Sequence, residues 1–597
     1  MSDSIDPQLL DYYQRELTWL RHAGSQFAER YPKVARRLEL SPGECPDPHV
    51  ERLLEGFALL AARLQRRLDD DYAEFSDALL EQLYPLAVRP LPSCAIVQFE
   101  PDPSKGNLDG GYPLPRDTPL FVTTSKGESI HFRTSAAVRL WPIEVSEALL
   151  LGGDEAQALT GVAQARSALR LSLRCLGESQ WSALGIEQLR IHLAASPVIN
   201  AGLYDLLGAH SVQVLAGSPG SIPITLKGLP TIVGFNDDEV LLPDEDGVHP
   251  GMRLLAEYFA FPDKFHFFDL PLRGIGSDSQ TLYLYIVFDR APASRMHLQA
   301  SDIALGCAPA INLFPRTSEP LRPDGTRSEY RLVADSHREN SVEIHSIRGM
   351  RASSSTGVQR LPAYYGSQHS GGDQQRYWHA RRVSGMTPNR LGSDLLVSVV
   401  DIRFEPQTDL PDYSLTAELL CTNRHLAQSL LAGTPLGFER PGPVAWARLR
   451  NPPSPQSLPR LDGDSRWRLV SQLTLNHLSL VEGPQALDAL KEILQLHNLR
   501  DEASALRQIE GLSSLRCERV IGHVGADAWR GWRNGLEVQL QLDPQHFVGS
   551  SAVLFSAVLA QFFSVYATAN RFVRTVLMQA DKEVKAWQPQ AGMPLSL

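Results

Sequence analysis

The chain has 597 residues, of which 43% are hydrophobic and 21% charged, and its formal net charge is −11. This length exceeds what one hydrophobic core organises, so we expect about three to five domains; the composition is typical of a soluble globular protein. The acidic balance argues against a general nucleic-acid-binding surface, which requires clustered lysine and arginine.

Two further classes of protein are disfavoured by the sequence. No run reaches the roughly 18–20 apolar residues of a membrane span, and Asp3 and Asp6 stand where a secretory signal carries lysines. We therefore expect no direct membrane insertion and a cytoplasmic protein. The cysteines are scattered without a CxxC pair, which fits reduced thiols and offers no zinc site: Cys45, Cys94, Cys175, Cys307, Cys421 and Cys517.

The first predicted element is a helix from Pro7 to about Tyr31, with a narrow apolar stripe. At 1.5 Å per residue it would be about 38 Å long, and Pro32 would bend or end it. The stripe recurs in steps of three and four, the heptad spacing through which one helix packs on another: Leu10, Tyr13, Leu17, Leu20, Gly24, Phe27 and Tyr31.

A second helix is expected from Pro48, with Asp47 as its N-cap, to Tyr84. Its wider apolar stripe, typical of a bundle core, is interrupted at Asp69–Asp71: Val50, Leu53, Leu54, Phe57, Leu60, Ala61, Leu64 and Leu68. Two interpretations of this N-terminal region stay open. It packs on its own chain, or part of its surface is buried against another subunit.

After Pro92 the apolar period changes from 3.6 to 2, which predicts antiparallel strands between turns rich in proline and glycine. The region from Gly251 to Leu270 is helical up to about Pro262 and holds five phenylalanines, either as a domain-junction core or as an aromatic docking patch. Strands are expected at 94–99, 120–123, 130–133, 138–145, 169–175, 189–193, 212–215, 281–288, 330–334, 342–347 and 395–404, with a helix near 201–207 and exposed loops at 366–375, 433–443 and 451–459.

The C-terminal region alternates again between helix and strand. Pro484–Leu496 is predicted as an amphipathic helix, Leu536–Leu542 as a strand, and Ser550–Val573 as a long helix. The apolar arc of that last helix is too wide for a lone surface helix. It is therefore either the central helix of a domain or part of an intersubunit bundle, with Phe555, Phe562 and Phe563 as candidate partner-binding residues.

The predicted fold class is multidomain α+β, with an N-terminal helical region, several antiparallel β-rich domains and a C-terminal α+β region. The expected segments are residues 1–92 (helical, a candidate intersubunit bundle), 93–250 (β-rich), 251–365 (aromatic junction and β-rich), 366–460 (β-rich with linkers) and 461–597 (α+β).

No pattern of catalysis is recognisable. Phosphate-binding, dinucleotide-binding, zinc-protease and nucleophile-elbow motifs are missing. Cys45 and His49 are separated by two prolines, and Asp335-Ser336-His337 lacks the geometry of residues that converge from separate elements. The acidic cluster from Asp237 to Asp246 matches no calcium loop and is expected to be solvated. We therefore predict no enzyme, catalytic residue, cofactor or metal.

Several long strings resemble the TssF family, also called ImpG or VasA, of the bacterial type VI secretion baseplate. They occur in order along the whole chain: YYQRELTWLRHAGSQFAERYPKVARRL, GECPDPHVERLLEGFALLAARLQRRLDDDYAEFSDALLEQLYP, RPLPSCAIVQFEP, RLLAEYFAFPDKFHFFDL, GCAPAINLFP, LCTNRHL, WRLVSQLTLNHLSL and GLEVQLQLDPQHFVGSSAVLFSAVLAQFFSVYATANRFV. Ungapped strings at so many places are more specific than a short catalytic motif.

The resemblance implies a structural, non-enzymatic wedge subunit. Its implied partners are TssG, with two copies of this chain per TssG, a second copy of itself, TssK, TssE and the VgrG spike, in a complex recruited to the inner membrane. Helices of two copies and a partner would form a core bundle, which suits the first stripe as the partner-binding surface (Leu10, Tyr13, Leu17, Leu20, Phe27 and Tyr31). Two alternatives are a hydrolase acting on glycans through carboxylates on β loops, and a wedge subunit of another contractile phage-tail-like particle.

Overall fold

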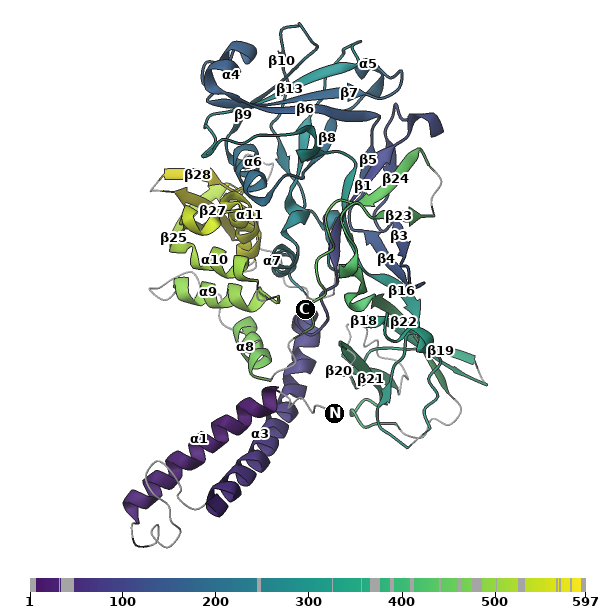
Figure 1. Ribbon diagram of the computed structural model, residues 1–597, viewed down its shortest axis with the longest axis vertical. Helices are drawn as coiled ribbons and strands as arrows, with labels where there is room; N and C mark the ends of the chain where they lie inside the picture. Colours follow the sequence, from purple (N-terminus) through teal and green to yellow (C-terminus); the bar gives the residue numbers. More distant parts are fainter. Residues whose placement is uncertain are drawn as a thin grey trace. The chain divides into compact units, whose positions relative to one another are not determined.

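The computed structural model describes residues 7–31, 33, 48–243, 248–324, 326–355, 357–365, 376–386, 391–407, 413–439, 442–459, 463–474, 486–500, 502–523, 532–564, 567, 571–579 and 582–591. The chain forms two compact units. The first comprises Met1–Glu81 and Arg460–Thr474, and the second comprises Gln82–Pro459 and Leu475–Leu597. Each unit is described by itself (Figure 1).

The first unit is helical, as the sequence predicted. Its elements are α1 (Pro7–Arg30, 24 residues), α3 (Pro48–Leu83, 36 residues) and α8 (Gly463–Thr474). The helix α3 is continuous through Asp69–Asp71, where its apolar stripe is interrupted, because aspartate costs only part of a kcal/mol within a helix, far less than proline does. The helix ends before Tyr84-Pro85, as predicted, whereas Pro32 and Asp47 lie outside the described residues.

The second unit contains a closed β-barrel whose strands come from distant parts of the chain. The order around the barrel is β1 (Cys94–Pro101), β15 (Cys307–Ile311), β4 (Ser129–Thr134), β3 (Pro119–Thr123), β23 (Pro435–Phe438) and β24 (Val444–Leu449). Strand β24 pairs with β1 and closes the barrel. A ribbon of β2 (Tyr112–Leu114) and β5 (Val138–Leu140) packs its Leu114 and Leu140 into the same core.

Residues 143–304, between β5 and β15 in the sequence, form two further antiparallel sheets, here called the middle sheets, and several helices; the larger sheet lies at the top in Figure 1. The first sheet has the order β10 (Ile224–Thr225), β9 (Ser211–Gly217), β13 (Thr281–Phe288), β7 (Ser167–Cys175), β6 (Ile143–Gly152). The second has the order β11 (Thr231–Ile232), β12 (Phe267–Pro271), β8 (Gln188–Leu193), β14 (Ile303–Ala304). The helices are α4 (Gly153–Thr160), α5 (Trp181–Leu184), α6 (Pro197–Ala209) and α7 (Pro250–Ala260), followed by the 3-10 turn η5 (Pro262–Phe265).

Two smaller sheets share one hydrophobic core and form a β-sandwich. One sheet has the order β16 (Phe314–Thr317), β22 (Ser414–Thr422), β18 (Glu343–Ser354), β19 (Gly357–Leu361). The other has the order β17 (Tyr330–Arg331), β21 (Ser393–Val400), β20 (Tyr377–Ser384). The side chain of Arg382 on β20 donates to the main-chain oxygens of Ile344 and His345 on β18, which fixes the two layers to each other.

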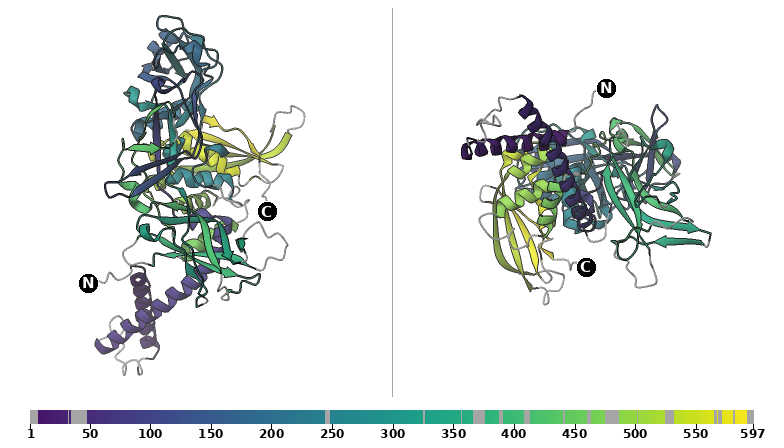
Figure 2. Two further views of the ribbon diagram at one scale, coloured as in Figure 1. Left: turned by 90° about the vertical axis from the view of Figure 1, so that its right-hand side faces the viewer. Right: turned by 90° about the horizontal axis from the view of Figure 1, so that it is seen from below.

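The C-terminal part of the unit comprises α9 (Ala486–His497), α10 (Ala503–Glu510), β25 (Leu512–His523), β26 (Trp532–Leu542), α11 (Ala552–Phe563), β27 (Phe572–Gln579), β28 (Lys582–Ala586) and β29 (Gln590–Ala591). The register of β25 and β26 runs from Leu512↔Leu542 to His523↔Trp532, beyond the part that β27 pairs, so their hairpin extends past its sheet (Figure 2, left).

The predicted helix over Ser550–Val573 is wrong in its extent. Phe572 and Val573 belong to β27, which pairs in parallel with β26. An apolar run that is buried on all sides does not distinguish a helix from a central strand by its period, and here it contains both.

The multidomain α+β class predicted from the sequence is confirmed. The largest core combines residues of the two middle sheets with α7, α9 and α11, so it joins segments more than 300 residues apart. The barrel likewise takes strands from three of the five expected segments. The five-segment division itself stays a prediction.

Candidate partner-binding surface

The apolar stripe predicted on α1 is largely accessible. Leu10, Phe27 and Tyr31 are exposed, and the Phe27 and Tyr31 rings contact each other with centroids 5.2 Å apart. The remaining candidates Tyr13, Leu17 and Leu20 are half-buried. Outside the stripe, Trp19 is 65% exposed, so α1 presents apolar surface on more than one side.

A second accessible stripe lies on α3 and is the more exposed of the two. We call Leu53, Phe57, Leu60 and Leu64 the α3 ridge. Their exposed fractions are 73%, 59%, 60% and 65%, respectively. From their wider stripe, these residues were expected in a bundle core. Their spacing of four, three and four matches the heptad seam of α1, which was the signal that a partner helix could cover them.

The arrangement of α1 and α3 explains why these side chains stay uncovered within the described part of the first unit. The two helices cross at an angle instead of lying alongside each other (Figures 1 and 2). Arg21 on α1 donates from Nε to Oε1 of Glu51 on α3 at 3.0 Å. Among the described residues from 7 to 65, the buried positions are all alanine, namely Ala28, Ala58 and Ala62. Close approach through alanine leaves the larger apolar side chains facing outward.

The three candidates on α11 have a different environment. Phe555 and Phe562 are 0% exposed and Phe563 is 3% exposed, all within the largest core of the second unit. The Phe555 ring contacts Tyr258 and Phe547, with centroids 5.8 Å and 5.6 Å apart. These phenylalanines therefore hold α11 against α7 within their own chain, the domain-core alternative of the sequence analysis.

The five phenylalanines of the 251–270 region also lie inside the protein. Phe259, Phe261, Phe265, Phe267 and Phe268 are all buried. Lys264 and Glu257 form a fully buried ion pair beside them. Oε1 of Glu257 also accepts hydrogen bonds from the N–H groups of Leu241 and Leu242, at 2.9 and 2.8 Å. This region is thus a junction core, the first of the two interpretations.

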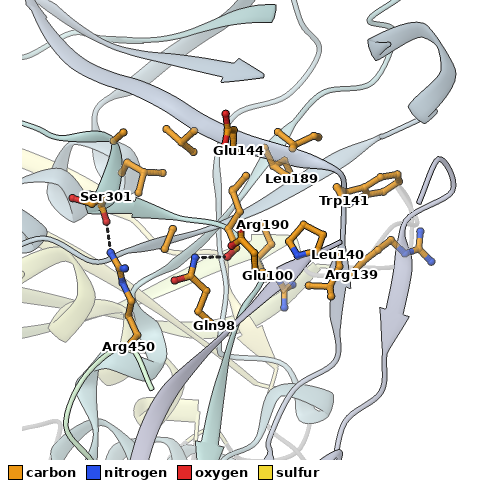
Figure 3. A pocket seen from close by; sticks show the side chains of 18 residues that line it. Gln98, Glu100, Arg139, Leu140, Trp141, Glu144, Leu189, Arg190, Ser301 and Arg450 are labelled. Atoms are coloured by element: carbon orange, nitrogen blue, oxygen red, sulfur yellow. Dashed lines mark hydrogen bonds between the residues drawn. The ribbon is translucent and has the colours of Figure 1, made fainter. Parts of the chain in front are cut away.

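A pocket of about 200 Å³ between the barrel and the middle sheets is the place to look for an acid–base pair (Figure 3). Glu100 and Glu144 both line it. Burial and the neighbouring Glu144 raise the pKa of Glu100, while Glu144 is held by Arg174 through a hydrogen bond of 2.6 Å. The carboxylate of Glu144 is therefore already paired with a cation. Ion pairs of this kind also occur in purely structural networks, so the raised pKa of Glu100 does not by itself indicate catalysis.

Part of the acidic cluster is not the solvated loop that we expected. Glu239 is buried, accepts the N–H of Gly234 at 2.8 Å and pairs with Arg190 at 3.0 Å. Its carboxylate accepts hydrogen bonds from backbone N–H groups around the 3-10 turn Asp237–Glu239. The acidic composition of this segment does not predict such a local structural role. Asp244, Glu245 and Asp246 lie outside the described residues, as does Cys45.

Within the described residues, no group of three or more His, Cys, Asp or Glu side chains could hold a metal ion. The helices of the described residues include none with the length and apolar character of a membrane span.

Comparison with known proteins decides the family. Residues 5–594 match the family described as Type VI secretion system, TssF. The chain is 33% identical to the Type VI secretion system component TssF1 of Pseudomonas aeruginosa strain PAO1, over 98% of this chain and 99% of that protein. The chain belongs to the TssF family.

Two solved structures share the fold of this TssF-family chain. One is a chain of the type VI secretion system TssK-TssF-TssG baseplate subcomplex, with a TM-score of 0.72 and 24% identity, covering 90% of this chain and 99% of that chain. The other belongs to the baseplate complex from the type VI secretion system, with a TM-score of 0.59 and 22% identity, covering 98% and 99%.

Two of the strings through which the chain resembles TssF meet inside the protein. Asn312, in GCAPAINLFP, accepts the N–H of Asn423, in LCTNRHL, at 2.7 Å and donates to the Asn423 side-chain oxygen at 2.9 Å. Asn423 in turn donates to Ser129 and Ser341 main-chain oxygens at 3.1 and 3.2 Å. The barrel and the sandwich are joined by this pair of amides, which is a structural role.

Proposed function

We propose that this TssF-family chain is a structural, non-enzymatic subunit of the type VI secretion baseplate. It would form a wedge with TssG and TssK, as the solved TssK-TssF-TssG subcomplex suggests for its relative, and join TssE around the VgrG spike to support sheath assembly. We further propose two copies of this chain per TssG, and assembly in the cytoplasm before recruitment to the inner-membrane-associated complex.

The observation that carries this proposal is the accessible apolar surface of α1 and α3. Burying a Leu or Phe side chain fully is worth about 1.5–3 kcal/mol, so the α3 ridge alone holds about 4–8 kcal/mol of unused transfer free energy. Heptad spacing on both helices fits an occupant that is itself helical. The stripe of Leu10, Tyr13, Leu17, Leu20, Phe27 and Tyr31 and the α3 ridge are therefore our proposed contacts to TssG and to a second copy.

The proposal is tested by co-purification of the full chain with TssG and TssK encoded in the same genome. We expect the double variant Leu53→Asp/Leu60→Asp to lose TssG while its circular dichroism and melting temperature stay unchanged. The matched control is Arg52→Gln/Arg63→Gln, which changes the net charge by the same amount at exposed polar positions of α3; it should retain TssG. Native mass spectrometry of the wild-type complex should show two copies of this chain per TssG.

If the ridge variant captures TssG as the wild-type chain does, the ridge is not the interface. The glycan-hydrolase alternative has one observation in its favour, the pocket with Glu100 and Glu144. It predicts that the purified chain alone releases reducing sugar from cell-wall glycan and that Glu100→Gln abolishes the release. We expect no release from either protein. The particle type, secretion or another contractile tail, follows from the neighbouring genes.

A further inference from the structure

A second pocket, of about 320 Å³, belongs to the second unit. It opens where the end of β8, the α7–η5 corner, the chain after β24, α10 and the turn before α11 meet, all within the second unit. Its volume equals that of about ten water molecules and lies at the small end of the range for ligand pockets. A ligand of only a few heavy atoms, or one side chain, fits this space.

A buried histidine without a polar partner lines this pocket. His192 is 5% exposed, and neither ring nitrogen has a hydrogen-bond partner among the described residues. Its ring packs against Phe267 with centroids 4.6 Å apart. A buried imidazole without a hydrogen-bond partner is destabilising relative to one whose nitrogens are hydrogen-bonded, because it has lost its contacts with water and gained none in the protein. A group that can hydrogen-bond to His192 would remove this penalty.

The other polar groups of the pocket are mostly engaged with each other. Tyr258 donates to Gln508 at 2.7 Å, and the Asp263 carboxylate accepts from Asn451 at 2.8 Å and faces Nδ1 of His266 at 3.4 Å. Asn200, at another part of the wall, bridges main-chain groups of Leu193 and Ala195. Among the described residues, His192 is thus a buried side chain of the wall with neither ring nitrogen hydrogen-bonded, and Nδ1 of His266 likewise has no hydrogen bond.

The charges of the lining select the ligand. Arg450 and Arg507 contribute two positive charges and Asp263 one negative charge. Burial, His266 and the charge of Arg450 lower the pKa of His192, and burial lowers that of His266, so both rings are neutral near pH 7. The remaining positive charge is balanced by one negative charge. A carboxylate matches this charge and can accept two parallel hydrogen bonds from a guanidinium group, whereas the charge of a phosphate dianion would exceed it.

We propose that this pocket binds a single carboxylate group, which accepts hydrogen bonds from His192 and from an arginine of the wall. The group comes either from a free small acid or from a glutamate or aspartate side chain of another protein. We assign this role to Arg450, which lines the pocket together with His192 and whose positive charge helps to lower the pKa of His192. It also donates to the main-chain oxygen of Ser301 in the neighbouring pocket (Figure 3), which holds its side chain in place.

The test is isothermal titration calorimetry of the full chain with sodium acetate. Sodium chloride and sodium phosphate, at equal ionic strength, are titrated for comparison. We expect saturable acetate binding, weakened about tenfold in Arg450→Gln, which loses a charged hydrogen bond, and about fivefold in His192→Phe. His210→Gln, a half-buried histidine outside the pocket that contacts Asp289 at 3.0 Å, is the control and should bind as the wild type does.

Three results would overturn the proposal: no saturable acetate signal above the chloride control, a phosphate affinity above that for acetate, or wild-type affinity in Arg450→Gln. The last result decides the question even if His192→Phe fails to fold. N-acetyl-glutamate α-amide distinguishes the two sources. Binding as tight as that of acetate indicates room for a protein side chain, and binding of acetate alone indicates a free small acid.

Discussion

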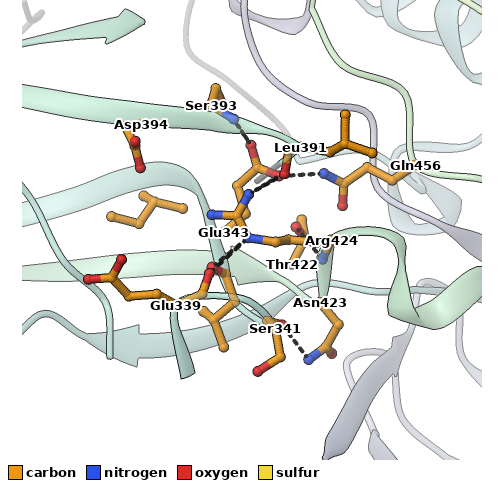
Figure 4. Close-up of polar contacts among 12 residues, drawn as sticks. Glu339, Ser341, Glu343, Leu391, Ser393, Asp394, Thr422, Asn423, Arg424 and Gln456 are labelled. Carbon is orange, nitrogen blue, oxygen red and sulfur yellow. Dashed lines mark hydrogen bonds and ion pairs between the residues drawn. The ribbon is translucent and has the colours of Figure 1, made fainter. Parts of the chain in front are cut away.

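The buried ion pair between Arg424 and Glu343 offers the sharpest test of how the β-sandwich is held together (Figure 4). Arg424 is 4% exposed and Glu343 is 1% exposed, and Nη1 of Arg424 lies 3.6 Å from Oε2 of Glu343. Glu343 also accepts from the N–H and Oγ of Ser393 and from Nε2 of Gln456, each at 2.7 Å. Arg424 donates to the main-chain oxygens of Glu339, Val342 and Leu391 at 3.1, 3.1 and 2.8 Å.

The expected energies follow from what each substitution leaves behind. Arg424→Met removes three hydrogen bonds to main-chain oxygens, two from Nε and one from Nη1. It also leaves the Glu343 carboxylate without its cation, so we expect a loss of about 3–5 kcal/mol. Glu343→Gln keeps an acceptor for Ser393 and should cost about 1–3 kcal/mol. The double variant should lose about 1–3 kcal/mol less than the sum, because the uncompensated carboxylate is then absent.

Native-state hydrogen exchange is the appropriate assay, since a chain of two compact units does not unfold in one step. The free energy of opening is read from amides of β18 and β21, on either side of the pair. The control is Arg351→Met, whose partner Glu418 lies on the neighbouring strand and whose side chain is 58% exposed; its loss should stay below about 1 kcal/mol. Additivity of Arg424→Met and Glu343→Gln within about 0.5 kcal/mol would refute the coupling.

Three further predictions concern other parts of the chain. Gly306→Ala should lower the melting temperature, because a Cβ there lies 2.4 Å from the Phe99 oxygen at a φ of +65°, whereas Gly110→Ala meets no atom within 4 Å and should not. Burial lowers the pKa of His497 to about 4, so the unfolded state binds more protons than the folded state between pH 6.5 and 4. About 3 kcal/mol of stability is therefore lost as the pH falls through that window. The melting temperature of His497→Gln should depend less on pH than that of the wild type. Phe555→Ala should cost about 3–5 kcal/mol in denaturant unfolding, while Phe57→Ala on the ridge should stay within about 0.5 kcal/mol and weaken only the capture of TssG.

The helices of the first unit were predictable because their pattern is local. Steps of three and four residues define a face without knowledge of any distant residue, and both α1 and α3 were found where the period placed them. What the period leaves open is which face is covered by the same chain. The α3 ridge has the pattern of a core and is nevertheless more than half exposed.

The arrangement of strands could not be predicted in the same way. Strand β1 pairs with β15 and β24, more than 200 and 300 residues away, and period-two alternation says nothing about which strands become neighbours. Charged side chains inside the protein were missed for a related reason. Glutamate and arginine are usually exposed, so the sequence gives no sign that Glu239 and Arg424 are buried. Their burial is possible because partners from elsewhere in the chain pair with them.

These two kinds of residue have different consequences for assembly. Asn312, Asn423 and Arg424 belong to strings through which the chain resembles TssF, and all three are engaged inside the second unit, where they orient the barrel against the sandwich. The side chains of the α3 ridge, by contrast, are more than half exposed. A substitution at the amides should therefore disturb every contact that depends on the relative placement of the two β domains, whereas a substitution on the ridge should remove one contact and leave the rest of the molecule unchanged. Hydrogen exchange would separate the two roles. In Asn423→Ala we expect faster exchange in both β4 and β18, and in Leu60→Asp we expect faster exchange in α3 alone. Faster exchange in β4 and β18 of both variants would show that the ridge also supports the interior.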